Sequence, residues 1–234
     1  MIIKKVPKIL SISVMAHPSR EKFFPYLKKK LGESVPFSID HNSEGVWPNA
    51  KKAWAMALDG EQALYHVVIQ DDAVVCDNFL ERAEGVVRDA IRRCKTSEIA
   101  ISFYFGKRGN LTDESKKALE RGFATRQSPT WGVAICLPVS HIAPMIEYGN
   151  RFNVPQDDYR IGMYLKKKGI RVYFPMPSLI DHRTSLETPS LVGDPGKFRC
   201  AYAFIDDPAM TYGSADERPP LRTELEEPKI EYIQ

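Results

Sequence analysis

Hydrophobic residues occur in short runs typical of buried strands, and these runs alternate with longer segments of helical spacing. The strand-like runs lie at residues 8–15, 35–39, 65–69, 99–105, 132–137 and 170–174. The helix-like segments lie at residues 20–31, 49–58, 77–93, 112–121, 139–148 and 155–168. Strand, helix and strand in succession predict right-handed βαβ units. The pattern therefore predicts an α/β fold with a mostly parallel, Rossmann-like central sheet flanked by helices.

The segments between these elements are predicted to be loops. Residues 45–49 and the Gly-containing basic stretch 106–110 have turn composition, residues 122–131 have no periodicity, and residues 175–183 are expected to be an extended loop. Residues 1–205 are expected to form a single domain. Residues 206–234 are acidic and contain proline, so we expect a poorly ordered or surface-wrapping tail.

The chain's most informative stretch runs from Tyr65 to Asp72. Apolar and β-branched residues lead directly into Asp71 and Asp72, which then lie at the carboxyl end of a buried strand. No Lys or Arg stands beside this pair in sequence, so the two carboxylates repel each other unless a cation lies between them. Mg²⁺ and Mn²⁺ are cations that prefer such oxygen ligands. The alternative is that the pair opens a turn and caps the next helix.

The charge distribution and the cysteines indicate which type of ligand and which cellular compartment to expect. The whole chain has a net charge of +3; residues 206–234 hold eight acids and three bases, a net of −5, which leaves +8 on residues 1–205. A basic body suits an anionic ligand. The four cysteines, Cys76, Cys94, Cys136 and Cys200, have no zinc-type spacing, and the chain has no signal-peptide layout and no membrane-spanning run. We therefore expect free thiols and a cytoplasmic protein.

The order of the motifs resembles GT-A fold glycosyltransferases, especially the family 2-like inverting enzymes. The features that carry the resemblance are Met15–Arg20, Ile39-Asp40, Asn49–Trp54, Gln70-Asp71-Asp72, Trp131–Pro138 and Gln156-Asp157-Asp158. The acidic motif is also similar to the Glu-Asp-Asp motif of family 25 enzymes, although Gln70 replaces the first acid. The resemblance covers residues 8–185 and implies a nucleotide-sugar donor, with UDP-sugar expected, and a Mn²⁺ or Mg²⁺ cofactor.

The resemblance also implies roles for particular residues. Asp72 is expected to ligate the metal with His182 as a second ligand, and Asp158 is expected to be the catalytic base. The expected nucleotide-sugar contacts are His17, Arg20, Asp40, Lys51, Asp71, Trp131 and Arg183. Each has a structural alternative: Asp157 and Asp158 as helix caps, His17 and His182 as ordinary loop histidines, and the remaining residues as turn, core or solvated surface positions. Trp54 is expected in the core, and His66 and His141 are expected to be structural.

The acceptor and the function class remain open from sequence. Small phage-encoded glycosyltransferases are similar in length, and some of their relatives are thought to modify hydroxymethylated DNA bases, which is an analogy of fold only. Basic residues at Lys107, Arg108, Lys116, Lys117, Arg121 and Arg126, with Phe123 and Trp131, are consistent with a DNA acceptor. The alternatives are a saccharide or protein acceptor, a nucleotidyltransferase, or a noncatalytic nucleic-acid-binding module. The turn at Ala16–Arg20 has no glycine, which disfavours the nucleotidyltransferase.

Overall fold

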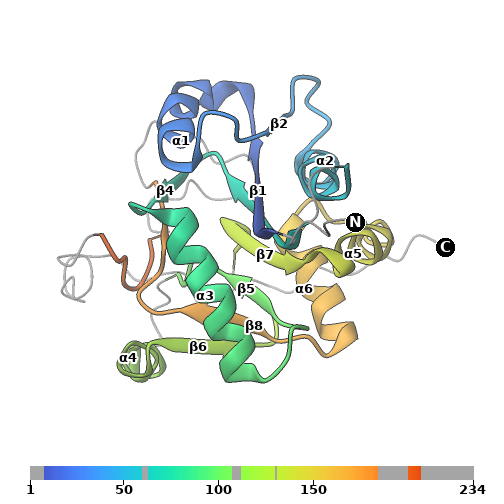
Figure 1. The fold of residues 1–234 in the computed structure, drawn as a ribbon. Helices are drawn as coiled ribbons and strands as arrows, with labels where there is room; N and C mark the ends of the chain where they lie inside the picture. The colour runs from blue at the N-terminus through green and yellow to red at the C-terminus, as the bar shows by residue number, and fades with distance from the viewer. Residues whose placement is uncertain (1–7, 60–62, 107–111, 130, 184–199, 207–234) are drawn as a thin grey trace, which may run out of the picture.

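A computed structural model describes residues 8–59, 63–106, 112–129, 131–183 and 200–206. Its centre is a seven-stranded sheet in the order β2-β1-β3-β7-β5-β8-β6 (Figure 1). The strands are β1 (Lys8–Ala16), β2 (Phe37–Ile39), β3 (Ala63–Gln70), β5 (Ala100–Ser102), β6 (Phe123–Arg126), β7 (Ala134–Pro138) and β8 (Val172–Pro175). Strands β7 and β6 run opposite to the other five. The predicted α/β fold with a mostly parallel sheet is confirmed.

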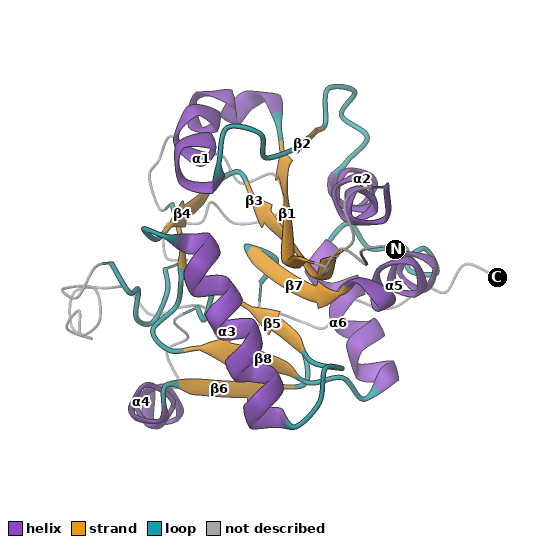
Figure 2. Ribbon diagram, viewed as in Figure 1, coloured by secondary structure: helices purple, strands orange, loops and turns teal. Residues whose placement is uncertain are grey.

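Helices cover both faces of this sheet (Figure 2). Helices α1 (Phe24–Leu31) and α3 (Phe79–Cys94) pack on one face. Helices α2 (Val46–Asp59), α5 (Ile142–Gly149) and α6 (Asp157–Lys168) pack on the other. Successive side chains of β3 point to opposite faces of the sheet, and both faces are apolar. Val67 and Ile69 pack in the core on the α1–α3 face, and Val68 packs in the core on the α2–α5–α6 face. Short 3₁₀ helices η1 (Pro18–Phe23) and η3 (Val139–His141) precede α1 and α5, and α4 (Thr112–Arg121) precedes β6.

The connections create a topological switch point at β1. The chain leaves β1 through α1 to reach β2 on one side, and it returns through α2 to β3 on the other side. Met15 pairs with Gln70, so the carboxyl ends of β1 and β3 lie side by side. Ligands of open α/β sheets bind in the crevice at such a point. The fold therefore places Asp71 and Asp72, as predicted, at the edge of the sheet that is suited to binding.

Three local predictions were wrong. Residues 46–49 belong to α2 rather than to a loop, because a proline in the first helical turn, here Pro48, does not need its missing N–H. Residues 123–126 form edge strand β6, which pairs with β8. Residues 180–182 form β9 (Ile180–His182), which pairs antiparallel with β4 (Ala73–Val75) in a separate two-stranded sheet.

Two other expectations, on the cysteines and on Trp54, are confirmed. All four cysteines are free thiols, and Trp54 is buried in the core. Among the described residues, none of the helices combines the length and the apolar character needed to cross a bilayer. The predicted loop residues Lys107 and Arg108, and the predicted tail after Asp206, lie outside the described residues.

His66 is a buried structural histidine, and its contacts join α2 to the sheet. Ser13 donates its hydroxyl proton to the carbonyl of Ala53 in α2, so it accepts from Nε2 of His66 at 2.9 Å. Nδ1 is then the acceptor for the hydroxyl of Ser11 at 2.8 Å. These contacts suit a neutral imidazole, and burial lowers the pKa of His66 to about 4.

We expect His66 to make the protein less stable in mild acid. In the unfolded chain the imidazole takes a proton near its ordinary pKa of 6.5, whereas in the folded chain it does so only near 4. Stability from this group is therefore present above pH 6.5 and is lost as pH falls toward 4, by up to about 3 kcal/mol. His66→Gln should remove this component from urea unfolding curves measured between pH 7 and pH 4. Exposed His41→Gln is the control, and equal pH dependence in His66→Gln and the parent would contradict the assignment.

Candidate functional site

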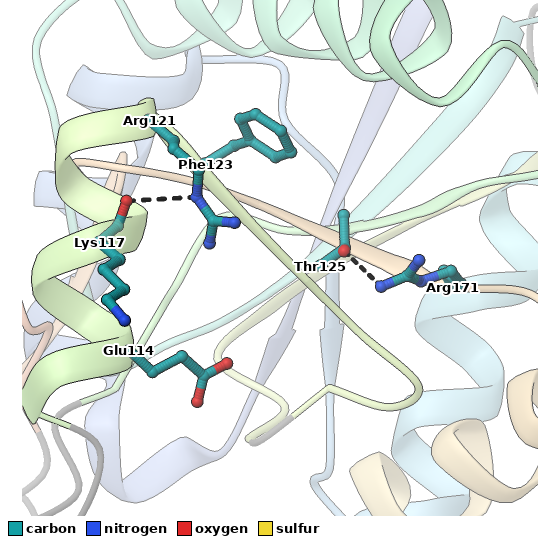
Figure 3. Close-up of a pocket in the computed structure, with 6 residues that line it drawn as sticks. All are labelled: Glu114, Lys117, Arg121, Phe123, Thr125 and Arg171. Carbon is teal, nitrogen blue, oxygen red and sulfur yellow. Dashed lines mark hydrogen bonds between the residues drawn. The ribbon is translucent and has the colours of Figure 1, made fainter.

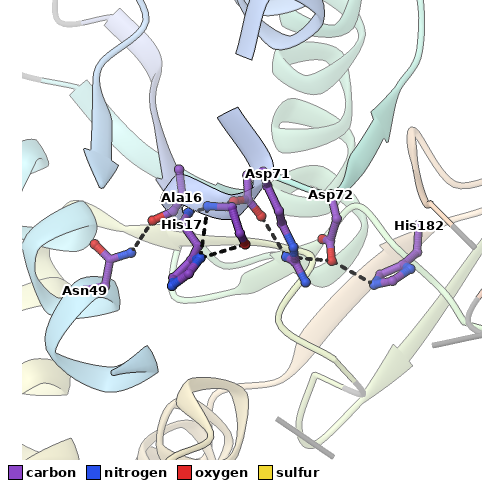
Figure 4. Close-up of polar contacts among 8 residues, drawn as sticks. Ala16, His17, Asn49, Asp71, Asp72 and His182 are labelled. Atoms are coloured by element: carbon purple, nitrogen blue, oxygen red, sulfur yellow. Dashed lines mark hydrogen bonds and ion pairs between the residues drawn. The ribbon is translucent and has the colours of Figure 1, made fainter. Parts of the chain in front are cut away.

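A continuous chain of polar contacts crosses the carboxyl ends of β1 and β3 (Figure 4). The backbone N–H of His17 donates to Oδ2 of Asp71 at 2.7 Å. Nη1 of Arg20 lies 2.8 Å from Oδ1 of Asp71 and 2.9 Å from Oδ2 of Asp72. Nε2 of His182 lies 3.3 Å from that same Oδ2. Four of the predicted site residues from three separate segments, Arg20, Asp71, Asp72 and His182, are thus in direct contact.

Arg20 supplies the positive charge that the sequence around Asp71 and Asp72 lacks. It comes from η1, 51 positions before Asp71, and its side chain is only 8% exposed. Burial raises the pKa of Asp71 despite the opposing charge of Arg20. For Asp72, burial also acts against ionisation, but the hydrogen bond and charge of His182 and the charge of Arg20 outweigh it and lower the pKa. The cation that the sequence required between these two carboxylates is thus supplied by Arg20, from a distant part of the chain.

The β4–β9 pair positions His182 and Arg183 at the acidic motif. Ala73 is the register partner of His182, and the N–H of Arg183 donates to the carbonyl of Asp72 at 2.9 Å. The guanidinium of Arg183 lies over the rings of Phe23 and Tyr26, at 4.6 and 4.5 Å from their centroids. Arg183 is therefore joined to Asp72 through its backbone, while its guanidinium is held by the two aromatic rings.

Asp72 and His182 have the chemistry of metal ligands. Oδ1 of Asp72 and Nδ1 of His182 are buried and have no hydrogen-bond partner among the described residues. Those residues contain no cluster of three metal-ligating side chains. A Mg²⁺ or Mn²⁺ site built from one or two protein ligands is completed by substrate phosphates and water. Each of the two side chains therefore keeps one buried atom of a type that ligates divalent ions.

A cavity of about 180 Å³ lies directly beside this chain of contacts. Met15, Ala16 and His17 line it from the end of β1, and Asp40, Ser43, Gly45, Val46 and Asn49 line it from the opposite side. The carboxylate of Asp40 accepts the N–H groups of Glu44 and Gly45 at 2.8 and 2.9 Å, which shapes the loop before α2. Nδ2 of Asn49 donates to the carbonyl of Ala16 at 2.8 Å. Predicted residues His17 and Asp40 thus share one cavity, and Asn49 anchors its wall.

Asp157 and Asp158 differ in environment more than the sequence indicates. Asp157 is buried at the first turn of α6, and a Cβ at Gly132 would lie 3.2 Å from both of its carboxylate oxygens and 3.0 Å from Nε2 of Gln70. Burial, followed by the charge of Asp158, raises the pKa of Asp157 to about 7. Asp158 is half-buried, and its Oδ1 accepts the N–H of Tyr159 at 2.7 Å. Asp157 therefore lies against Gly132, which the side-chain amide of Gln70 also approaches, in an environment quite different from the capping role predicted for it.

The remaining predicted contacts lie outside this cluster. Lys51 is half-buried on α2 and does not line the cavity. Trp131 packs against Tyr104, with ring centroids 5.7 Å apart, and against Gly106, where a Cβ would lie 1.7 Å from the indole. Lys117 and Arg121 line a different cavity between α4 and β6, at the opposite edge of the sheet from β2. These basic residues are therefore not neighbours of the acidic motif.

Comparison with known proteins does not assign the chain to a family. No family model matches it, and no curated protein matches it. Among solved structures, A197 from STIV is similar with a TM-score of 0.43 at 11% identity, over 76% of this chain and 86% of that chain. A similarity this low carries no functional argument, so the function has to be argued from the site.

Arg20 should be required for stability because it compensates two buried carboxylates. Arg20→Met should lower the free energy of unfolding by about 3–5 kcal/mol, the usual cost of leaving buried charge without its partner. Adding Asp71→Asn and Asp72→Asn should recover more than half of the loss, since neutral amides no longer need the cation. Urea unfolding measures both effects.

The matched control is Arg88→Met, which removes an exposed ion pair with Glu84 and should leave stability unchanged. Loss of less than about 1 kcal/mol in Arg20→Met would show that water or other groups already compensate the carboxylates.

Proposed function

We propose that the protein is a glycosyltransferase of the GT-A type, which transfers a sugar from a nucleoside-diphosphate sugar to an acceptor hydroxyl. The observation that carries the proposal is the contact between a cavity at the switch point and the chain Asp71–Arg20–Asp72–His182. A nucleoside in the cavity would direct its diphosphate along this chain of contacts. Such an arrangement matches the needs of a donor whose leaving group is a nucleoside diphosphate.

The residues in this series of polar contacts would have different roles in donor binding. Asp40 and His17 would hold the nucleoside, and Asp71, fixed by the N–H of His17 and by Arg20, would orient the ribose side of the donor. Arg20 and Arg183 would carry positive charge toward the diphosphate. Asp72 and His182 would hold the divalent ion, which acts as a Lewis acid on the leaving group. Lys51 and Trp131 remain predicted donor contacts. Neither lines the cavity, so a donor would have to extend beyond the cavity to contact them.

Inverting transfer needs a base that removes the acceptor proton. The resemblance to family 2-like enzymes predicts Asp158 for this role. The burial of Asp157 beside Gly132, and its pKa of about 7, favour Asp157 as the base, with Asp158 raising its pKa by charge. A carboxylate with that pKa is about half ionised at neutral pH, and its ionised form is a stronger base than an ordinary aspartate.

The acceptor class is proposed from charge. Residues 1–205 carry a net charge of +8, which suits an anionic acceptor, and a hydroxymethylated base in DNA is the acceptor that the phage-enzyme analogy suggests. A saccharide or protein hydroxyl is the alternative. Transfer of radiolabelled sugar to hydroxymethylpyrimidine DNA, compared with transfer to simple glycosides, separates the two.

The donor site is tested with uridine diphosphate and Mn²⁺. Asp72→Asn should abolish the Mn²⁺-dependent part of binding in calorimetry, because it removes a charged ligand while Arg20 keeps its contact with Asp71. Asp71→Asn should have a smaller effect, and Asp77→Asn, at an exposed acid, should have none. Affinity that is unchanged in Asp72→Asn would overturn the metal assignment.

The base is tested by turnover in a donor screen with Mn²⁺ present. Replacing the base by asparagine should lower turnover by about 10²–10⁴-fold with little change in donor binding. The geometry predicts this loss in Asp157→Asn, whereas the family resemblance predicts it in Asp158→Asn. With Asp157 as base, kcat/KM should rise as pH increases through about 7, because only the ionised carboxylate accepts a proton. Full turnover in both variants would rule out a base in this pair.

A further inference from the structure

A second cavity, about 460 Å³ in volume, lies between α4 and β6, far from the acidic motif (Figure 3). We call it the α4–β6 groove. Its lining residues are Glu114, Lys117 and Arg121 of α4, Phe123 and Thr125 of β6, and Arg171, which immediately precedes β8. Glu114, Lys117, Arg121 and Arg171 are exposed, so the groove opens to solvent along its length. Its size is within the range of ligand-binding cavities.

The groove carries positive charge that is not neutralised within the described residues. None of those residues places a carboxylate within ion-pair distance of Lys117, Arg121 or Arg171. Nε of Arg121 instead donates to the carbonyl of Lys117 at 3.2 Å, and Nη2 of Arg171 donates to the hydroxyl of Thr125 at 2.5 Å. The acid of the groove, Glu114, lies 3.3 Å from Arg126. Three cations therefore face solvent, and the Thr125 hydroxyl keeps its proton for an acceptor.

An aromatic platform stands beside these cations. The ring of Phe123 is stacked on Tyr173, with centroids 5.3 Å apart and planes 6° from parallel. The guanidinium groups of Arg93 and Arg121 lie 4.9 and 5.8 Å from the centroid of Phe123. Guanidinium planes and aromatic rings are the surfaces on which nucleic-acid bases stack. The groove thus combines groups for phosphate with groups for bases.

The three cations line the groove from two separate parts of the fold, α4 and the residue before β8. Lys117 and Arg121 are neighbours one helical turn apart, with Cβ atoms about 5–6 Å from each other. Arg171 lies beyond Thr125, on the other side of β6 from these two residues (Figure 3). This arrangement along the groove suits an extended chain of phosphates, whose charges repeat along its length.

We propose that the α4–β6 groove binds the phosphodiester backbone of a single-stranded nucleic acid. Lys117, Arg121 and Arg171 neutralise phosphates, the Thr125 hydroxyl donates to a phosphate oxygen, and the guanidinium of Arg93 on Phe123 provides a stacking surface. Because β6 is four strands from β3 in the sheet, this site is separate from the donor cavity and does not depend on the proposed transferase activity.

Fluorescence anisotropy with a labelled oligothymidylate tests the proposal. The combined variant Lys117→Gln, Arg121→Gln and Arg171→Gln should weaken binding about ten- to a hundredfold at low salt, and the slope of log K against log salt should become shallower by about 2, at roughly 0.7 per lost phosphate contact. The matched control, Lys29→Gln, Lys52→Gln and Arg151→Gln, lowers the net charge equally from other surfaces of the molecule. It should retain the parent slope.

Three results would overturn the proposal. The oligonucleotide fails to bind at low salt, the control variant loses as much affinity as the groove variant, or pyrophosphate competes at the same concentration as the oligonucleotide phosphate, which would indicate a site for small anions. Titration with uridine diphosphate and Mn²⁺ should be unchanged in the groove variant. Failure at the groove therefore leaves the donor-site result standing, and intact nucleic-acid binding without donor binding would favour a noncatalytic module.

Discussion

Neutralisation of the two buried carboxylates is the constraint on which the site depends. Asp71 and Asp72 are 2% and 3% exposed, and adjacent carboxylates at that burial cannot both stay ionised without a cation. Arg20 meets this need and thereby fixes η1 against the end of β3. The same fixed turn presents the N–H of His17 to Asp71 and forms one wall of the cavity. Neutralisation of Asp71 and Asp72 by Arg20 thus fixes the turn after β1 against the acidic motif, beside the contact between His182 and Asp72.

The parts of the fold that were predicted from sequence are those fixed by local pattern. Strands β1, β3 and β7 contribute to the buried cores, so their sequences are mostly apolar and easy to recognise. Strand β6 lies at a sheet edge and contributes only Ala124 to the buried core, so its sequence has no such run. Strands β4 and β9 are three residues each and exist because they pair with one another across more than a hundred positions. Pairing of that kind leaves no periodic signal in either segment.

In the candidate site too, residues were predicted where their own segment indicates them, and were missed where their role depends on a partner distant in sequence. Carboxylates at the ends of buried strands indicated Asp40, Asp71 and Asp72 as candidates, because strand ends share one edge of a parallel sheet. The partner of Asp71 could not be inferred, since Arg20 is 51 positions away and nothing in its own segment distinguishes it from a solvated turn residue. Likewise the distinction between Asp157 and Asp158 depends on Gly132, whose missing side chain leaves room for one carboxylate.

The separation of the two charged regions limits how they can influence each other. Four strand spacings lie between β3 and β6, or about 19 Å at the usual distance between neighbouring strands. The Debye length at physiological salt is about 8 Å, so the field of the α4–β6 groove is largely screened before it reaches Asp72. With the donor site proposed above, the acidic motif would therefore hold its anionic ligand with the charge of Arg20 and with an ion at Asp72 and His182, rather than with the charge of the groove. Any cooperation between the two regions would have to come from one long ligand that reaches both, rather than from the overall charge of the protein.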